Sequence, residues 1–160
     1  GMVLQDTWLF AGTIRDNILY GRPEATEEEM LAASKAAYVD RFVRSLPEGY
    51  DTVLDDEAMN LSVGERQLIT IARAFLANPR LLILDEATEG LAPLVRRDIW
   101  QALQQLKSTG LAILCIDKNL SSMLPLADRH YIVEKGRVAW EGSSHDYLQA
   151  RDSWQAYLGV

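Results

Sequence analysis

The sequence predicts an α/β fold that is built on a mainly parallel sheet. Two short apolar runs, 81–84 and 111–117, each follow an amphipathic stretch whose apolar residues recur at three- and four-residue spacing. Parallel strands that are covered on both faces read as continuous apolar runs, and helices cross between them. The alternation of such runs with helices therefore favours strands that are buried between helices.

Length and composition are typical of one soluble globular domain. The chain has 160 residues, of which 48% are hydrophobic and 24% charged, and its formal net charge is −7. Nucleic-acid binders usually carry a basic face, so this acidic balance excludes nucleic acid from the expected partners. No apolar run reaches the ~20 residues that cross a bilayer. Cys115 is the single cysteine, which leaves no disulfide framework, and a cytoplasmic location is expected.

A small helical subdomain is predicted near the start of the chain. Helical spacing runs from residue 13 to residue 49, and Thr26 with Glu29 has the pattern of a capping box. The segment 49–60 carries turn-forming and acidic residues without periodicity. It is expected to be a loop.

A longer helix follows this loop. Ser62 with Glu65 repeats the capping-box pattern, and the apolar spacing continues until Pro79 stops it, after about four turns. We therefore predict two regions. Residues 1–80 hold the helical subdomain and this helix. Residues 81–160 hold the strand at 81–84, which Asp85 and Glu86 follow, and the elements after it.

The second region is predicted to alternate strands and helices. After the strand at 81–84, the expected elements are a helix at 93–108, a strand at 111–117, a helix at 119–127, strands at 130–135 and 137–142, and two short terminal helices.

Asp85 and Glu86 end the first of these strands. Open α/β sheets gather their ligands at the carboxyl ends of strands, and two carboxylates there suit Mg²⁺ and an activated water. Mg²⁺ keeps several waters, so Asp85 would hold it through water, while Glu86 would orient or deprotonate the attacking water. The alternative is a solvated strand end that caps a helix.

Ser62 and Gly64 open the long helix. Free backbone amides and the positive end of the helix dipole stand there beside a hydroxyl, and such an arrangement binds phosphate. The alternative is an ordinary capping box without a ligand.

Two motifs together resemble a known family. "LSVGERQ" at 61–67 and "LLILDEAT" at 81–88 stand in the order and at the spacing of the signature motif and Walker B of the ATP-binding cassette of ABC transporters. The resemblance implies part of a P-loop NTPase (RecA-like) parallel sheet with a helical subdomain. It also implies Mg-ATP as cofactor, Glu86 as the catalytic residue and Asp85 as a metal ligand.

The same resemblance assigns residues that bind nucleotide. In the family, ATP lies between the Walker A of one subunit and the signature motif of the other. Ser62, Val63, Gly64 and Glu65 would therefore act on a partner's ATP. The segment "VLQDTWLFAGTIRDNILYG" resembles the glutamine loop of exporters, which makes Gln5 a ligand for Mg²⁺ and the water site. In the family this loop also faces the membrane domain.

The later part of the chain resembles a different branch. "EGLAP" at 89–93, "LADRHYIVEKGRVAWEG" and "AYLGV" are similar to the ATPase subunits of branched-chain amino-acid importers. We therefore suspect a chimera with an exporter-like front and an importer-like back, joined near Glu86 to Glu89. A natural divergent subfamily is the alternative.

Two parts of the family machinery do not occur in this sequence. None of its four lysines stands in the G-K-[ST] context of a phosphate loop. Lys118 stands where the family's switch histidine is expected, and a lysine is a poor neutral acceptor at pH 7. The resemblance thus implies a sheet that lacks the phosphate-loop strand and a chain without ATPase activity of its own.

The function expected is that of a piece of an ABC transporter ATP-binding domain, whose family role is ATP-driven transport. The alternative is an engineered or shuffled structural or interaction module without nucleotide activity. Expected partners are a membrane transporter subunit or domain, a second cassette, and another copy of the chain, because unpaired strand edges invite pairing. His130 and His145 are expected in surface or capping roles, and Trp8 is considered for partner contact.

Overall fold

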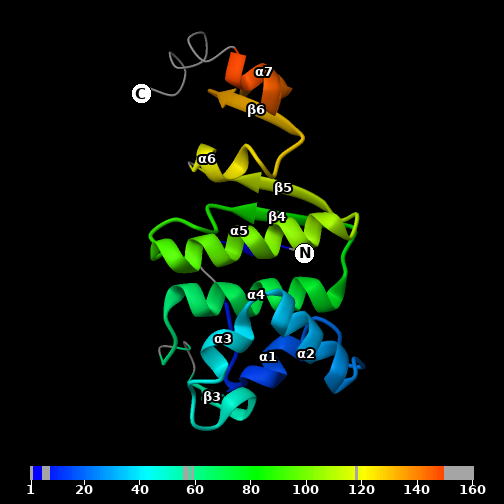
Figure 1. The fold of residues 1–160 in the computed structure, drawn as a ribbon, viewed down its shortest axis with the longest axis vertical. Coiled ribbons are helices and arrows are strands. Elements are labelled where there is room, and N and C mark those ends of the chain that lie inside the picture. The colour runs from blue at the N-terminus through cyan, green and yellow to red at the C-terminus, as the bar shows by residue number, and fades with distance from the viewer. Residues whose placement is uncertain (1, 5–7, 56–57, 59, 118, 150–160) are drawn as a thin grey trace. The chain divides into compact units, whose positions relative to one another are not determined.

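A computed structural model describes residues 2–4, 8–55, 58, 60–117 and 119–149. It has the mixed α/β architecture that the sequence predicts, and Figure 1 follows its elements along the chain. The chain divides into two compact units, residues 1–118 (unit 1) and 119–160 (unit 2). The division at residue 80 rests on motif content and stays a prediction. Within the described ranges, no helix is both long enough and apolar enough to cross a membrane.

Unit 1 contains a parallel sheet of three strands in the order β1-β4-β5. The strands are β1 (Met2–Leu4), β4 (Leu81–Asp85) and β5 (Ala112–Ile116). Leu4 pairs with Asp85, and Asp85 pairs with Ile116. The carboxyl ends of all three strands therefore lie along one edge. β1 was not predicted, because three residues are too few to show a period.

Helix α4 (Val63–Ala77) joins the parts of unit 1. It contacts α1 (Ile14–Leu19) and α2 (Glu27–Ala36) of the helical subdomain, and also α5 (Pro93–Ser108) and β1. It therefore stands between that subdomain and the sheet layer (Figure 1). The predicted length of about four turns is confirmed. The helix ends at Asn78, whose left-handed backbone (φ 43°) stops it just before Pro79.

The first turns of α4 and α5 are in close contact at Gly64. A Cβ atom added there would lie 2.4 Å from Cγ1 of Val95, which is far inside van der Waals distance. Gly64 is buried. The absence of a side chain at residue 64 is therefore a packing requirement as well as a feature of the motif.

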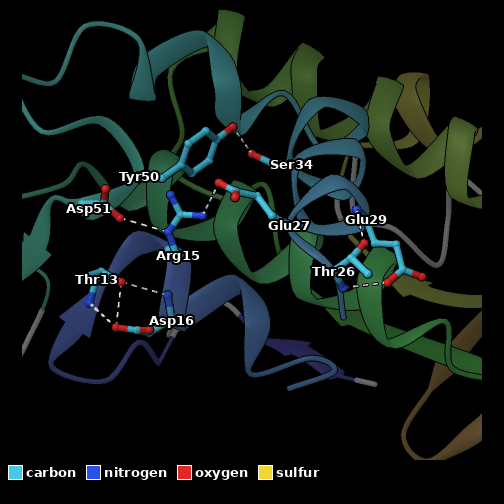
Figure 2. A network of polar contacts seen from close by, with 9 residues as sticks. All are labelled: Thr13, Arg15, Asp16, Thr26, Glu27, Glu29, Ser34, Tyr50 and Asp51. Carbon is cyan, nitrogen blue, oxygen red and sulfur yellow. Dashed lines mark hydrogen bonds and ion pairs between the residues drawn. The ribbon is translucent and has the colours of Figure 1, made fainter. Parts of the chain in front are cut away.

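The helical subdomain consists of three short helices, α1 (Ile14–Leu19), α2 (Glu27–Ala36) and α3 (Val39–Val43). Thr13 and Thr26 form complete capping boxes with Asp16 and Glu29 (Figure 2). The helical pattern expected up to residue 49 is interrupted at Tyr38, whose left-handed backbone (φ 61°) separates α2 from α3. Apolar spacing does not reveal such a break, because it is similar on both sides.

Arg15 connects the pieces of this subdomain (Figure 2). Its Nε atom donates to Asp51 at 3.0 Å and its Nη1 atom to Glu27 at 2.8 Å. Asp51 ends a 3-10 turn, η1 (Gly49–Asp51). The next residues form β3 (Val53–Leu54), which pairs antiparallel with β2 (Gly12–Thr13). The segment predicted to be a loop therefore contains a short strand.

The described part of unit 2, residues 119–149, is a hairpin with two small helices. The elements are α6 (Leu120–Met123), β6 (Arg129–Glu134), β7 (Arg137–Ser143) and α7 (Ser144–Gln149). β6 and β7 pair antiparallel with an irregularity at Ile132 and Val133. Ile132 and Tyr147 form its small core, with Trp140 packed against them. The hairpin predicted around Gly136 is confirmed, and the second terminal helix falls outside the described residues.

His130 is buried in unit 2, so the surface role suggested for it is wrong. It is 7% exposed, its ring lies 5.4 Å from that of Tyr147, and Nε2 stands 2.8 Å from Oγ of Ser144. The Ser144 hydroxyl is also 2.9 Å from the carbonyl oxygens of Leu124 and Ala127. The hydroxyl has one proton and donates to one acceptor at a time, so Ser144 joins the His130 ring to the backbone before β6. Burial lowers the pKa of His130.

We expect Gly64→Ala to destabilise unit 1 by about 1–2 kcal/mol, because overpacking against Val95 outweighs the higher helix propensity of alanine. In a Val95→Ala background the 2.4 Å contact is lost and only the Cβ atom of residue 95, at 3.2 Å, remains close, so the same change should cost clearly less stability than it does beside Val95. Urea denaturation of the four proteins measures both effects. Equal effects in the two backgrounds would contradict the contact.

The free energy of unfolding of unit 2 should decrease as the pH falls below the unfolded-state pKa of His130. Because that pKa is lower in the folded state, the unfolded chain binds the proton first, and acid favours unfolding. Hydrogen exchange of β6 and β7 amides at about pH 7.5 and about pH 5.5, corrected for intrinsic rates, measures this. His130→Gln should lose part of the pH dependence, and the exposed His145, changed to Gln, should keep it.

Candidate functional site

The first group of candidate residues lies at the carboxyl edge of the sheet. Asp85 closes β4 with an exposed side chain. Glu86 follows in a left-handed backbone conformation (φ 48°), and its N–H donates to the carbonyl of Ile116 at 2.8 Å. For a non-glycine residue this conformation costs on the order of 1–3 kcal/mol and is frequent at functional sites. The chain turns sharply here, and the Glu86 side chain is half-buried.

A hydrogen bond between two side chains supports this edge. Oγ1 of the buried Thr88 donates to Oδ2 of Asp117 at 2.6 Å. Asp117 follows β5 as Asp85 ends β4, so the bond ties the turn after Glu86 to the neighbouring strand. Sequence reasoning missed this pair. The available signal was a second acidic residue at the end of an apolar run.

The donor chemistry of this edge is compatible with Mg²⁺. Among the described residues, the Asp85 side chain has no hydrogen-bond or ion-pair partner, so its carboxylate is available to a cation. The part of the chain that the structure describes holds no group of three or more acidic, histidine or cysteine side chains able to bind a metal. Mg²⁺ commonly takes one or two carboxylates, with waters and phosphate oxygens completing its shell. Gln5 lies outside the described residues, and β1 ends beside Asp85 at Leu4.

The second group is the first turn of α4. Ser62 is the N-cap, and its Oγ accepts from the Glu65 amide at 3.3 Å. The Glu65 carboxylate accepts from both the amide and the hydroxyl of Ser62, at 2.8 Å and 2.7 Å. Val63 is exposed and Gly64 is buried against α5. The predicted capping box is therefore confirmed in full, and its hydroxyl is engaged by Glu65.

An aromatic cluster lies on unit 1 and is made of the exposed Trp8 and Tyr20 and the half-buried Phe10. Trp8 and Tyr20 are 64% and 61% exposed, and the ring centroids of the cluster lie 5.5–6.4 Å apart. Trp8, which the sequence singled out for partner contact, is thus a surface residue with aromatic neighbours. Apolar surface gathered in this way commonly marks an interaction site.

Arg73 of α4 contacts all three residues of the aromatic cluster. Its guanidinium donates to the backbone oxygens of Trp8 and Asn17 and to Oδ1 of Asn17. It also lies 5.6 Å from the ring centroid of Phe10 and 5.4 Å from that of Tyr20. Burial lowers the pKa of Arg73 to about 10, so the group remains charged at neutral pH. Sequence reasoning assigned Arg73 to the helix but not to this role.

The remaining predicted residues fall outside both groups. Lys118, proposed at the position of the switch histidine, lies outside the described residues. His145 is exposed and pairs with Gln149 through Nε2 at 2.8 Å, as a surface role predicts.

Comparison with known proteins supports the interpretation of the two motifs. Residues 1–89 match the family model described as "ABC transporter". This range is more than half of the chain and contains both Ser62 to Glu65 and Asp85 with Glu86.

Individual relatives match almost the whole chain. A "Fatty acid ABC transporter ATP-binding/permease protein" of Mycobacterium bovis is 48% identical over 94% of this chain and 24% of its own length. An "ATP-dependent lipid A-core flippase" of Desulfotalea psychrophila is 41% identical over 96% of this chain and 27% of its own. The chain thus spans about a quarter of the length of these relatives.

A solved structure has the same fold. It is that of a bacterial Atm1-family ABC exporter with ATP bound, which superposes with a TM-score of 0.84 at 38% identity and covers 98% of this chain and 27% of that one. Its match and the relatives' matches run across Glu86 to Glu89. They do not show two parent families, so the chimeric origin stays a prediction. Family match, relatives and fold agree, and the chain belongs to the ABC transporter family, as part of an ATP-binding domain.

Proposed function

We propose that this chain supplies two parts of a Mg-ATP site whose phosphate loop is carried by other residues. These parts are the signature motif and the acidic edge, by which we mean Asp85 and Glu86 at the carboxyl edge of the sheet. The observation that carries this proposal is that one compact unit contains both the N-capped start of α4 and the strand β4, which ends at Asp85 and is followed by Glu86. The contact of Gly64 with Val95 supports it, since α5 follows the acidic edge in sequence and its first turn packs on the first turn of α4. The family's role is ATP-driven transport.

Phosphate binding at α4 requires an exchange of partners. In this structure the hydroxyl of Ser62 donates to the Glu65 carboxylate. To donate to a phosphate oxygen it must rotate away, while the amides of Val63 and Gly64 belong to the first turn, where no intrahelical acceptor exists. We propose that Ser62, Val63, Gly64 and Glu65 bind ATP in trans, with Glu65 keeping the cap through the Ser62 amide.

At the acidic edge we propose a division of roles. Asp85 holds hydrated Mg²⁺, and Mg²⁺ when bound neutralises charge on the phosphates. Glu86 is the catalytic residue that orients or accepts a proton from water. The left-handed backbone at Glu86 supports this role because it turns the side chain out of the strand direction. Gln5 is proposed as a further ligand, on the ground that β1 ends beside Asp85.

The proposal is tested by calorimetric titration with Mg-ATP. The chain alone should show no submillimolar binding, because the phosphate loop accounts for most contacts to the triphosphate. A mixture with a cassette that carries Walker A should show ATP-dependent association. Submillimolar binding by the chain alone, or no association in the mixture, would contradict the proposal.

Ser62→Asp provides a sharp variant for this titration. Aspartate is as good an N-cap as serine, so α4 should stay folded, while its charge repels phosphate and should abolish the association. Thr26→Asp is the matched control, because Thr26 caps α2 with the same box of contacts. The control should associate like the unchanged chain.

We also propose a membrane transporter subunit or domain as partner, contacted through the glutamine loop and the helical subdomain, on the cytoplasmic face of the membrane. The aromatic cluster of Trp8, Phe10 and Tyr20 supports this proposal. The named relatives that combine ATP-binding and permease parts in one protein support it as well.

Self-association is proposed for the open face of the sheet. Leu114 and Ile116 of β5 are 49% and 52% exposed, and Leu81 of β4 lies on the same face. On the opposite face Leu82 and Leu84 of β4 are fully buried, and Ile113 and Cys115 of β5 are half-buried. Contiguous apolar surface of this kind favours association with a second copy.

Light scattering over a concentration series measures this association. The chain should form dimers or larger oligomers, and Leu114→Glu should shift it to a monomer, because a charge cannot be buried cheaply in an apolar contact. Leu94→Glu is the control, since Leu94 is an exposed leucine on α5, away from this face of the sheet. A monomer at every concentration would exclude the proposal.

A further inference from the structure

A groove on the helical subdomain collects positive charge in an otherwise acidic chain. Its volume is about 650 Å³, and α2, the Tyr38 break, α3 and α5 line it. Lys35, Arg41 and Arg44 contribute three cations to the lining and Asp40 one anion. Two alanines of α2 give it an apolar part. None of these residues belongs to the proposed nucleotide site.

Arg41 is held in one orientation. Its Nη1 atom donates to the buried Asp98 at 2.7 Å, and its guanidinium carbon lies 4.2 Å from the ring centroid of Tyr38. Among the described residues the other N–H groups of the Arg41 guanidinium have no hydrogen-bond acceptor. A guanidinium fixed in this way presents donors to an anion with little loss of side-chain freedom.

The other two cations are free to move onto a ligand. Lys35, at the end of α2, has no ion-pair partner among the residues that the structure describes. Arg44 pairs with Asp40 at 3.1 Å but is mostly exposed, and solvent-exposed pairs of this kind contribute little. Both side chains can therefore leave their present positions at small cost.

Tyr38 gives the groove an unusual wall. Its backbone has φ 61° although it is not glycine, and its hydroxyl accepts from Nε2 of Gln105 at 3.0 Å. Arg41 packs on its ring. Left-handed tyrosine is an uncommon, strained conformation, and such residues cluster at ligand sites.

We propose that this groove binds a phosphomonoester, with Lys35, Arg41 and Arg44 around its phosphate. A phosphomonoester carries a charge of about −1.5 to −2 at neutral pH and has three acceptor oxygens. The groove therefore offers one cation for each of these oxygens. Arginine forks are the preferred partners of such groups. The apolar part of the groove suits the carbon skeleton of an organic phosphate. The same chemistry occurs in a free sugar or glycerol phosphate and in the headgroup of phosphatidic acid.

The test is a titration of the isotope-labelled full chain, followed by NMR. One arm uses glycerol 3-phosphate, and the other uses phosphatidylcholine vesicles with and without equal parts of phosphatidic acid. We expect the amide signals of Lys35, Tyr38 and Gln105 to shift in at least one arm. Shifts with the free phosphate identify a soluble ligand, and shifts only with acidic vesicles identify a lipid headgroup. No shift at the groove in either arm overturns the proposal.

Charge-matched variants separate this site from general attraction. Lys35→Gln with Arg44→Gln should weaken binding about tenfold or more. Arg80→Gln with Lys135→Gln removes one arginine and one lysine from exposed positions elsewhere and should leave the affinity within about twofold. Equal losses in the two double variants overturn the proposal.

A second pair of variants keeps every cation in place. Gln105→Glu adds a negative charge at the groove and should also weaken binding about tenfold. Gln104→Glu makes the same change one residue earlier on α5, at an exposed position outside the groove, and should bind normally. Unchanged binding by Gln105→Glu overturns the proposal. Because glycerol 3-phosphate has no nucleobase and no triphosphate, these outcomes are independent of the Mg-ATP proposal.

Discussion

The contact between Gly64 and Val95 is the constraint on which the arrangement of unit 1 depends. It brings the first turn of α4 onto the first turn of α5, and a Cβ atom at residue 64 would stand 2.4 Å from Val95 Cγ1. α5 begins just after the acidic edge, so the position of the helix start relative to that edge is set by the packing of these two helices. The glycine that we propose for phosphate binding is also the residue that permits the close packing of α4 on α5.

The parallel pairing of three strands provides the second constraint. Leu4, Asp85 and Ile116 are in register, so whatever follows each strand is delivered to one edge. The turn at Glu86 and the bond between Thr88 and Asp117 then connect two of these strand ends. Asp85 and Asp117 therefore lie at the same edge of the sheet because the strands that lead to them pair in parallel.

The sequence predicted the elements whose signal is local. The capping box of Ser62 and Glu65 predicted the start of α4, because its signal is contained in four residues. The apolar run at 81–84 predicted β4. Contacts between distant residues could not be predicted. Arg73 donates to Trp8, and Thr88 donates to Asp117, but no spacing rule links these positions. The break at Tyr38 was missed for another reason, since a left-handed non-glycine residue contradicts local preference and is held by Arg41 and Gln105.

The anchoring of the aromatic cluster by Arg73 has a consequence for recognition. Asn17 is fully buried and bonds to the backbone of Phe10 and Thr13, while Arg73 bonds to Asn17 and Trp8. The backbone that carries the exposed rings is therefore already fixed before any partner arrives. Ordering a loop on contact costs conformational entropy. A surface built in this way avoids most of that loss, so its affinity depends on the fit of the rings rather than on their rearrangement.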